Sequence, residues 1–402
     1  MRLLSSICLL FACITFGYSQ IYFPGRTDKW SHKTPAEAGL NADSIRSAIK
    51  YAQENESTGE PNLEINHYLN GFGREPYGDG VGPFKTRGAQ SGVILKDGYI
   101  IAEWGEPERV DMTFSVTKSF LSSTIGMAFD RGLITNVHDR VDKYMAPIMP
   151  LQSARGTNRA DHLGEPMVIE PFKSEHNSKI TWDHLLRQTS DWQGSLWGKP
   201  DWADRPSGER SEMIKRDRVE PGTVYEYNDT RVNLLALAAT NIWRQPLQKV
   251  LKEKLMDPID ATSTWRWMGY ENSWIIMDGQ AVEIPSGGGH WGGGMFINAY
   301  DQARFGYLTM CRGKWRGEQI LSDEWVTMAL TPTTANTSYG FMNWFLNTDK
   351  KMLPSAPESA FFHLGAGTNM VYVDPDNGIV IVARWIDRSA MDGIVSRVLG
   401  AF

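Results

Sequence analysis

The strongest constraint on the fold is the order of the apolar segments along the chain. Strand-like segments lie toward both ends, and helix-like segments occupy the middle. Residues 92–104 form two apolar runs about Asp97-Gly98, a dipeptide typical of a β-hairpin turn. Residues 369–373 and 379–385 form a second pair of strand-like runs. This order predicts an α+β protein in which one antiparallel sheet is built from both termini, with flanking helices and an inserted, mainly helical subdomain.

Helical spacing of apolar residues recurs between and beside these strands. Residues 56–90 are instead rich in Gly, Pro and Asn and predict a loop. We expect one domain over residues 21–402, with an α/β part at about 21–110 and 290–402 and a helical part at about 111–289. The predicted helices cover residues 40–55, 115–131, 181–188, 231–243, 246–256, 299–311, 322–330 and 390–399.

Residues 1–20 predict a secretory signal peptide. Arg2 provides the positive start, residues 3–16 are apolar but too short for a membrane span, and residues 17–20 are small and polar. A lipoprotein box at Cys13 is disfavoured because apolar residues continue after it. The predicted mature chain is therefore secreted or periplasmic, and it retains only Cys311, so it has no internal disulfide.

Composition and motif searches exclude several other classes of function. The net charge of −6 supplies no basic field for nucleic acid, and no later apolar run is long enough to span a bilayer. The histidines lack paired metal-site spacing, so we expect no metal and no cofactor. Residues 287–292 formally match a dinucleotide-binding glycine motif, but they do not lie between a strand and a helix. The absence of a G-x-S-x-G motif argues against an α/β-hydrolase.

A serine and a lysine at the start of a predicted helix form the first candidate catalytic pair. Their spacing places Lys118 one turn after Ser115, on the same helix face. Ser115 would lie at the positive end of the helix, where backbone N–H groups are free. A partly buried lysine disfavours its ammonium form and can accept the serine proton. The pattern alone is weak, because Ser47 and Lys50 share it on an ordinary helix surface.

Tyr227 is the second candidate. It follows the Pro221-Gly222 turn and lies just before the predicted helix 231–243. A tyrosine whose phenolate is stabilised by a lysine can relay protons. Taken alone, the residue is better explained as packing at a helix entry.

The sequence His-Leu-Gly-Ala-Gly at 363–367 is the third candidate, because it directly precedes a strand. The glycine at Gly365 allows a substrate to approach the strand edge. The backbone N–H of Ala366 could join that of Ser115 in an oxyanion hole, and His363 could donate a hydrogen bond to the substrate.

In this order, the motifs resemble those of the serine β-lactamase-type hydrolases. That family includes class C β-lactamases, D-alanyl-D-alanine carboxypeptidases, esterases and 6-aminohexanoate-dimer hydrolases. The resemblance implies a β-lactamase/transpeptidase-like fold, with Ser115 as the acylated nucleophile, Lys118 as its activating partner and Tyr227 as the family tyrosine. The segments that carry it are residues 114–120, 130–133, 141–144, 180–190, 221–227, 287–296 and 301–305.

Two positions depart from the family pattern. Asp229 stands where the family has Asn, in the segment Tyr227-Asn228-Asp229, which puts its amide contact to substrate in doubt. His363 replaces the lysine of the K-T-G motif, which removes the permanent cation for a β-lactam carboxylate. His184, in the T-x-x-H-L-L segment, is interpreted as structural.

The leading hypothesis is a secreted serine hydrolase that cleaves a carboxylic ester or amide through a Ser115 acyl-enzyme. Its substrate would be a small molecule or a peptide- or glycan-linked ester or amide. The alternatives are a D-alanyl-D-alanine carboxypeptidase or penicillin-binding protein, a β-lactamase, and a non-hydrolytic binder on the same scaffold. With 15 Trp in the chain, an aromatic pocket wall is also expected, with Trp291 as the best candidate. The other candidates for that wall are Trp104, Trp192, Trp197, Trp202, Trp267 and Trp344.

Overall fold

A computed structural model describes residues 21–25, 30–151 and 168–402 of the chain, so the predicted signal peptide at 1–20 lies outside the described residues. Among the helices of those three ranges, none has the length and apolar character needed to cross a membrane.

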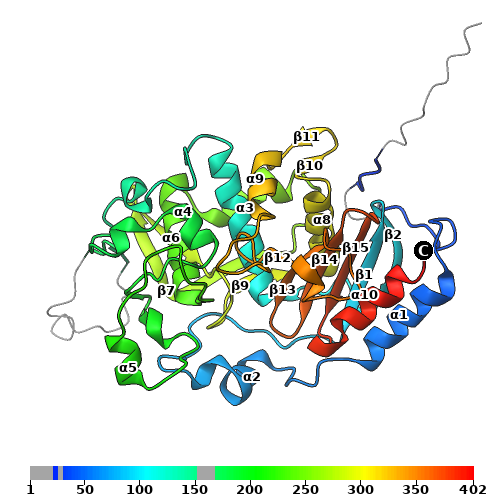
Figure 1. The fold of residues 1–402 in the computed structure, drawn as a ribbon, viewed down its shortest axis with the longest axis horizontal. Helices are drawn as coiled ribbons and strands as arrows, with labels where there is room; N and C mark the ends of the chain where they lie inside the picture. Colours follow the sequence, from blue (N-terminus) through cyan, green and yellow to red (C-terminus); the bar gives the residue numbers. More distant parts are fainter. Residues whose placement is uncertain (1–20, 26–29, 152–167) are drawn as a thin grey trace, which may run out of the picture.

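A six-stranded antiparallel sheet joins segments from both ends of the chain, as predicted (Figure 1). Its N-terminal hairpin meets the C-terminal strands where β1 pairs with β15, which places Ser91 opposite Arg384. The two predicted strand pairs therefore form one sheet. Its strands, in spatial order, are β12 (Phe345–Leu346), β13 (Phe361–Gly365), β14 (Asn369–Asp374), β15 (Ile379–Arg384), β1 (Ser91–Lys96) and β2 (Tyr99–Trp104).

Both faces of this sheet are covered by helices, because successive strand residues point to opposite sides. On β15, Ile379 and Ile381 pack into the core beneath α1 (Ala42–Glu54) and α10 (Met391–Leu399). Val380 on the same strand faces the other core, which α8 (Ala299–Met310) covers. Figure 1 shows α1 and α10 side by side along one face of the sheet.

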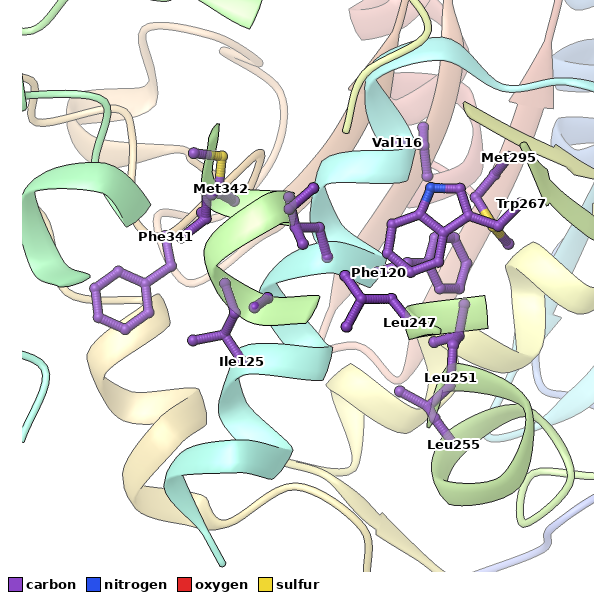
Figure 2. Close-up of a cluster of buried hydrophobic side chains, with 14 of the residues drawn as sticks. Val116, Phe120, Ile125, Leu247, Leu251, Leu255, Trp267, Met295, Phe341 and Met342 are labelled. Atoms are coloured by element: carbon purple, nitrogen blue, oxygen red, sulfur yellow. The ribbon is translucent and has the colours of Figure 1, made fainter. Parts of the chain in front are cut away.

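Two helices that are buried on nearly every side form the centre of the inserted part. α3 (Thr117–Phe129) and α6 (Asp229–Trp243) are buried along almost their whole length. Their many apolar residues pack in the core, and their polar residues, Lys118 and Asp229 among them, are buried as well. Figure 2 shows Phe120 of α3 next to α7 (Leu247–Leu251) and Trp267.

The inserted part also contains strands that the apolar pattern did not predict. β7 (Arg266–Met277) and β8 (Gln280–Pro285) form a hairpin, and β7 also pairs with β9 (Gly294–Ile297). Polar residues interrupt the alternation in β7, and a shift of register follows Gly269. The signal in the sequence is therefore too irregular for a prediction from periodicity.

A second difference is the helix α2 (Leu63–Asn70), which lies inside the segment 56–90 that was predicted as loop. The Asn62 side chain caps it by accepting hydrogen bonds from the backbone N–H groups of Glu64 and Ile65. A helix of eight residues is too short for a clear apolar period, so the cap was the available signal.

The other predicted helices are confirmed to within a few residues. The short elements that complete the fold are β3 (Asp111–Met112), β4 (Met149–Pro150), α4 (Trp182–Leu186), β5 (Ser195–Leu196), β6 (Lys199–Pro200), α5 (Arg210–Lys215), β10 (Lys314–Trp315), β11 (Glu318–Gln319) and α9 (Asp323–Ala329).

Candidate active site

Ser115 lies in a tight turn between strand β3 and helix α3. The turn is a single 3-10 segment, Phe114–Val116, and Phe114 has a φ of 47°, in the left-handed region that bulky side chains rarely adopt. Such strained residues cluster at functional sites, where surrounding packing holds them in place. The turn leaves Ser115 partly exposed, whereas the neighbouring Thr113 is fully buried.

The structure brings the three predicted catalytic residues together. The Lys118 ammonium donates a hydrogen bond to Ser115 Oγ over 2.9 Å. The Tyr227 hydroxyl also interacts with the Ser115 side chain. Lys118 Nζ also lies 4.8 Å from the centroid of the Tyr227 ring. Because Lys118 is fully buried, both of its contacts are shielded from water.

Tyr227 holds its proton in this site. Burial and, next, the nearby Asp229 carboxylate raise the pKa of the Tyr227 hydroxyl far above its usual range. A phenolate relay is therefore disfavoured. The neutral hydroxyl is instead suited to donating a hydrogen bond or a proton.

Asp229 lies behind the lysine, in contact with three cationic side chains. One of its oxygens is 2.5 Å from Lys118 Nζ, and the other is 2.8 Å from Arg205 Nη1 and 3.1 Å from His290 Nδ1. Although burial favours the neutral acid, Lys118 and Arg205 hold the pKa of the Asp229 carboxyl well below its usual range. The sequence left a substrate contact at Asp229 in doubt, and in the structure its oxygens face protein cations and its side chain is buried.

His290 extends this network away from the serine. Its Nε2 lies 2.7 Å from Glu75 Oε2 and 3.2 Å from Asp204 Oδ1, and the Phe72 ring stacks on the imidazole at 3.7 Å. Burial opposes the imidazolium, but the surrounding carboxylates raise the pKa of His290 above its usual value. Burial also raises the pKa of the Asp204 carboxyl.

Glu75, Asp204 and His290 are also the residues that could hold a metal ion, because their ligand atoms lie within 4.8 Å of one another. In the structure these carboxylates are paired with the imidazole and with Arg205, whose Nη1 is 2.8 Å from Asp204. The charges of these side chains therefore already balance one another in an ion-pair network.

The sequence analysis missed Glu75, Asp204, Arg205 and His290 as members of the site. Glu75 and Arg205 lie in segments without a periodic pattern, and His290 falls in the glycine-rich segment that was set aside as a false dinucleotide motif. That segment has a different role. A Cβ placed on Gly288 would lie 2.1 Å from Lys118 Nζ and 2.2 Å from Asp229 Oδ1, so only glycine lets the backbone pass this ion pair.

The end of strand β13 lies against the turn that carries Ser115. A Cβ on Gly365 would lie 2.0 Å from the Thr113 carbonyl oxygen and 3.2 Å from the Ser115 nitrogen. Glycine is therefore required at this crossing, because a side chain would clash with the backbone of the turn. Ala366 follows directly and is partly buried against the apolar cluster that contains Phe114.

His363 occupies a different place from the one predicted. It is fully buried, and its Nδ1 lies 2.8 Å from Ser119 Oγ and 3.3 Å from the Asn343 carbonyl oxygen. Its ring is enclosed by Phe305, Trp344 and other aromatic side chains. Burial lowers the pKa of His363 to about 3, so the imidazole is neutral. Its predicted role as a substrate donor is corrected to core packing, because strand alternation directs it toward helix α3.

The tryptophan prediction is also corrected. Trp291 is fully buried between His290 and Tyr270, so it supports the histidine from behind instead of lining a surface pocket. Of the seven tryptophans proposed for a pocket wall, only Trp202 is partly exposed. By contrast, the structural interpretation of His184 is confirmed: its Nδ1 accepts a hydrogen bond from the Thr181 backbone N–H and completes a capping box at α4.

The composite sheet, the buried helix that begins beside a serine, and the lysine one turn later define the architecture of the serine β-lactamase-type hydrolases. A family model described as Beta-lactamase matches residues 85–385. The chain belongs to this β-lactamase family, because the match covers most of its length.

Individual relatives are distant but extensive. A protein of Escherichia coli O157:H7 named "Putative D-alanyl-D-alanine carboxypeptidase" is 21% identical over 402 residues, covering 88% of this chain and 84% of its own. Among solved structures, EstCE1, a hydrolase with promiscuous acyltransferase activity, has a TM-score of 0.54 at 15% identity, covering 89% of this chain and 98% of that one. A penicillin-binding protein homolog from Caulobacter crescentus has a TM-score of 0.53 at 12% identity, with 90% and 99% covered.

Proposed function

We propose that this protein is a secreted or periplasmic serine hydrolase that cleaves a carboxylic ester or amide bond through an acyl-enzyme on Ser115. The observation that carries the proposal is the 2.9 Å hydrogen bond from Lys118 Nζ to Ser115 Oγ, at a partly exposed serine that also interacts with Tyr227. The predicted signal peptide at 1–20 supports export. Residues 21–402 would then be the mature hydrolase domain.

The reaction begins with proton transfer. In its neutral form, Lys118 accepts the Ser115 proton while Ser115 Oγ attacks the substrate carbonyl, which forms a tetrahedral intermediate. The backbone N–H groups of Ser115 and Ala366 stabilise the oxyanion, at about 3 kcal/mol for each donor. Tyr227, which keeps its proton, donates to the leaving alcohol or amine as the acyl-enzyme forms. Lys118 then passes the serine proton to Tyr227, which restores both groups. Water attacks the acyl carbonyl, Lys118 accepts the proton of the water, and it returns this proton to Ser115 Oγ as the acid product leaves.

A D-alanyl-D-alanine carboxypeptidase is the second candidate, and the names of the Escherichia coli relatives favour it. β-Lactamase activity has less support. The position that carries the lysine of the family's K-T-G motif is His363 here, and that histidine is buried and neutral. No cation at this position would receive a β-lactam carboxylate.

Intact-protein mass spectrometry with a substrate panel tests the proposal. The panel contains a p-nitrophenyl ester, a linear amide, a D-Ala-D-Ala peptide and a penicillin. We expect a transient acyl adduct on Ser115 together with product release for the ester or the amide, and no adduct in Ser115→Ala. A stable adduct without product would indicate a binder instead. Full turnover by Ser115→Ala would contradict the proposal.

Replacing Asp229 by Asn is expected to lower the acylation rate by up to about 10²-fold, because a displacement of about 1 Å in a catalytic group can cost that much. The Asp229 carboxylate lies 2.5 Å from Lys118 Nζ, on the lysine that bonds to Ser115 Oγ over 2.9 Å. In the variant an amide replaces the carboxylate, so the ion pair that holds the lysine in place is lost. The effect is measured as the acylation rate with the p-nitrophenyl ester.

Asp201→Asn is the matched control for this rate. Asp201 is also a buried carboxylate and pairs with Arg218 and Arg231 instead of Lys118. Its variant should lose stability without lowering the acylation rate. If both variants acylated at the wild-type rate, Asp229 would have no role in positioning the lysine.

A further inference from the structure

A buried guanidinium behind the proposed oxyanion hole is not used by the mechanism above. Arg384 ends strand β15 and is 1% exposed. No carboxylate oxygen lies within ion-pair distance of it among the described residues. Its hydrogen bonds instead go to backbone carbonyls and one amide. A buried cation held this way adds little net stability, so its geometry calls for another explanation.

The first set of bonds holds the segment that leads into Ser115. Arg384 Nη2 donates to the Met112 carbonyl oxygen over 3.1 Å, and Nη1 donates to the Ile297 carbonyl oxygen over 2.7 Å. Met112 belongs to β3, which pairs with β9 through Met112 and Phe296. The guanidinium thus fixes the end of β3 three residues before the serine. The planar fork of arginine suits this double contact, which a lysine cannot reproduce.

The second set holds the turn that carries Ala366. Arg384 Nε donates to Asn369 Oδ1 over 2.9 Å, and Asn369 Nδ2 donates to the Ala366 carbonyl oxygen over 2.9 Å. Asn369 is fully buried and lies opposite Gly365 in the β13–β14 ladder. Within this turn, Gly367 and Thr368 have φ values of 69° and 52°, so the backbone direction is fixed by an unusual conformation.

We propose that Arg384 and Asn369 together are the positioning unit of the oxyanion hole: a single guanidinium sets the spacing between the Ser115 and Ala366 backbone N–H groups. The two donors come from segments far apart in sequence, at the end of β3 and the end of β13. The contact between Gly365 and the Thr113 carbonyl brings the segments together. The Arg384–Asn369 pair sets their relative orientation. This inference rests on the proposed acyl-enzyme mechanism. In it, two residues that do not touch the substrate hold the backbone N–H groups that stabilise the oxyanion.

The test is Asn369→Ala, read by two measurements. The first is the rate and the substrate dependence of acylation by the p-nitrophenyl ester. The second is the affinity of an alkyl boronic acid, which bonds to the serine and places an oxygen where the oxyanion forms. We expect the maximal acylation rate to fall about 10- to 100-fold, with little change in the ester concentration that gives half of that rate. The affinity for the boronic acid should fall by a similar factor.

Asn347→Ala is the matched control. Asn347 is equally buried, and its side chain bonds to Leu353 and Ala356 of another loop. It should lower thermal stability as Asn369→Ala does while leaving boronate affinity close to wild type. Equal changes in the two variants would overturn the inference, because both would then act through stability alone.

Substitution of Arg384 is an independent test of the same inference. Arg384→Met should lower boronate affinity, and adding Asn369→Ala should cause little further loss, because the two residues act as one unit. Additive losses would contradict a shared role. If wild-type protein bound no boronate and formed no acyl adduct, the proposed function itself would fail, whereas normal wild-type labelling with unaltered Asn369→Ala would reject only the positioning role.

Discussion

Replacing Lys118 by Met is expected to lower the rate of Ser115 acylation on the order of 10³- to 10⁶-fold, the range seen when a member of a catalytic unit is removed. Methionine has nearly the length of lysine but cannot accept the serine proton. Among the described residues, Lys118 Nζ is the only amine within hydrogen-bond distance of Ser115 Oγ. Adding Ser115→Ala should cause no further loss, since the two residues act in one step.

Stability must be separated from chemistry in this variant, because Lys118→Met removes one cation from buried Asp229. Arg205 and His290 continue to compensate that carboxylate. A Lys118→Met/Asp229→Asn double variant removes the charge imbalance and should recover thermal stability without recovering acylation. Acylation is measured as the burst of p-nitrophenol in the first turnover. A burst of wild-type rate in either variant would assign the general base elsewhere.

The second large effect is expected at Gly288. Gly288→Ala should lower kcat/KM by about 10²-fold or more, because a displacement of about 1 Å in a catalytic group can cost that much. The added Cβ would lie 2.1 Å from Lys118 Nζ and 2.2 Å from Asp229 Oδ1. Both atoms are the ends of side chains, so the clash is relieved by moving the lysine and its partner. The loss of folding stability should be smaller, at about 1 to 3 kcal/mol, as for other overpacked interiors.

Gly208→Ala is the control, because it changes the backbone entropy in the same way as any other Gly→Ala substitution. Gly208 is exposed, and the nearest atom to its added Cβ is Glu212 Oε2 at 3.6 Å, an ordinary contact. That variant should keep wild-type kinetics, and its free energy of unfolding should stay within about 0.5 kcal/mol of the wild-type value. Wild-type kcat/KM in Gly288→Ala would show that the lysine tolerates displacement, against the geometry argued above.

The fold was largely predictable because its main signals are local. The Asp97-Gly98 turn and the apolar alternation of residues 369–385 predict the antiparallel strands. Helical spacing of apolar residues predicts α1, α6, α8 and α10. The β7–β8 hairpin and α2 were not predicted. In the hairpin, polar residues and a register shift hide the period, and α2 spans only eight residues. Their stability comes from partners elsewhere in the chain.

The site was predictable only where chemistry depends on spacing within one element. Ser115 and Lys118 are one helical turn apart, so the chain itself brings them together. Residue type and neighbours in sequence do not show whether a side chain faces solvent or the core. The structure buries Asp229, His363 and Trp291, which the sequence had offered as candidate substrate contacts.

Local pattern was therefore sufficient for the α+β class and for the sheet built from both ends. The serine, lysine and tyrosine of the candidate site were indicated by the ordered set of motifs that resembles the family. Tertiary packing decided the rest: the ion-pair network of Asp229, Arg205 and His290, the need for glycine at 288, and the Arg384–Asn369 pair. Each of these joins segments that are distant along the chain. Their energies depend on burial and on distances of a few ångströms, which no periodicity in the sequence encodes.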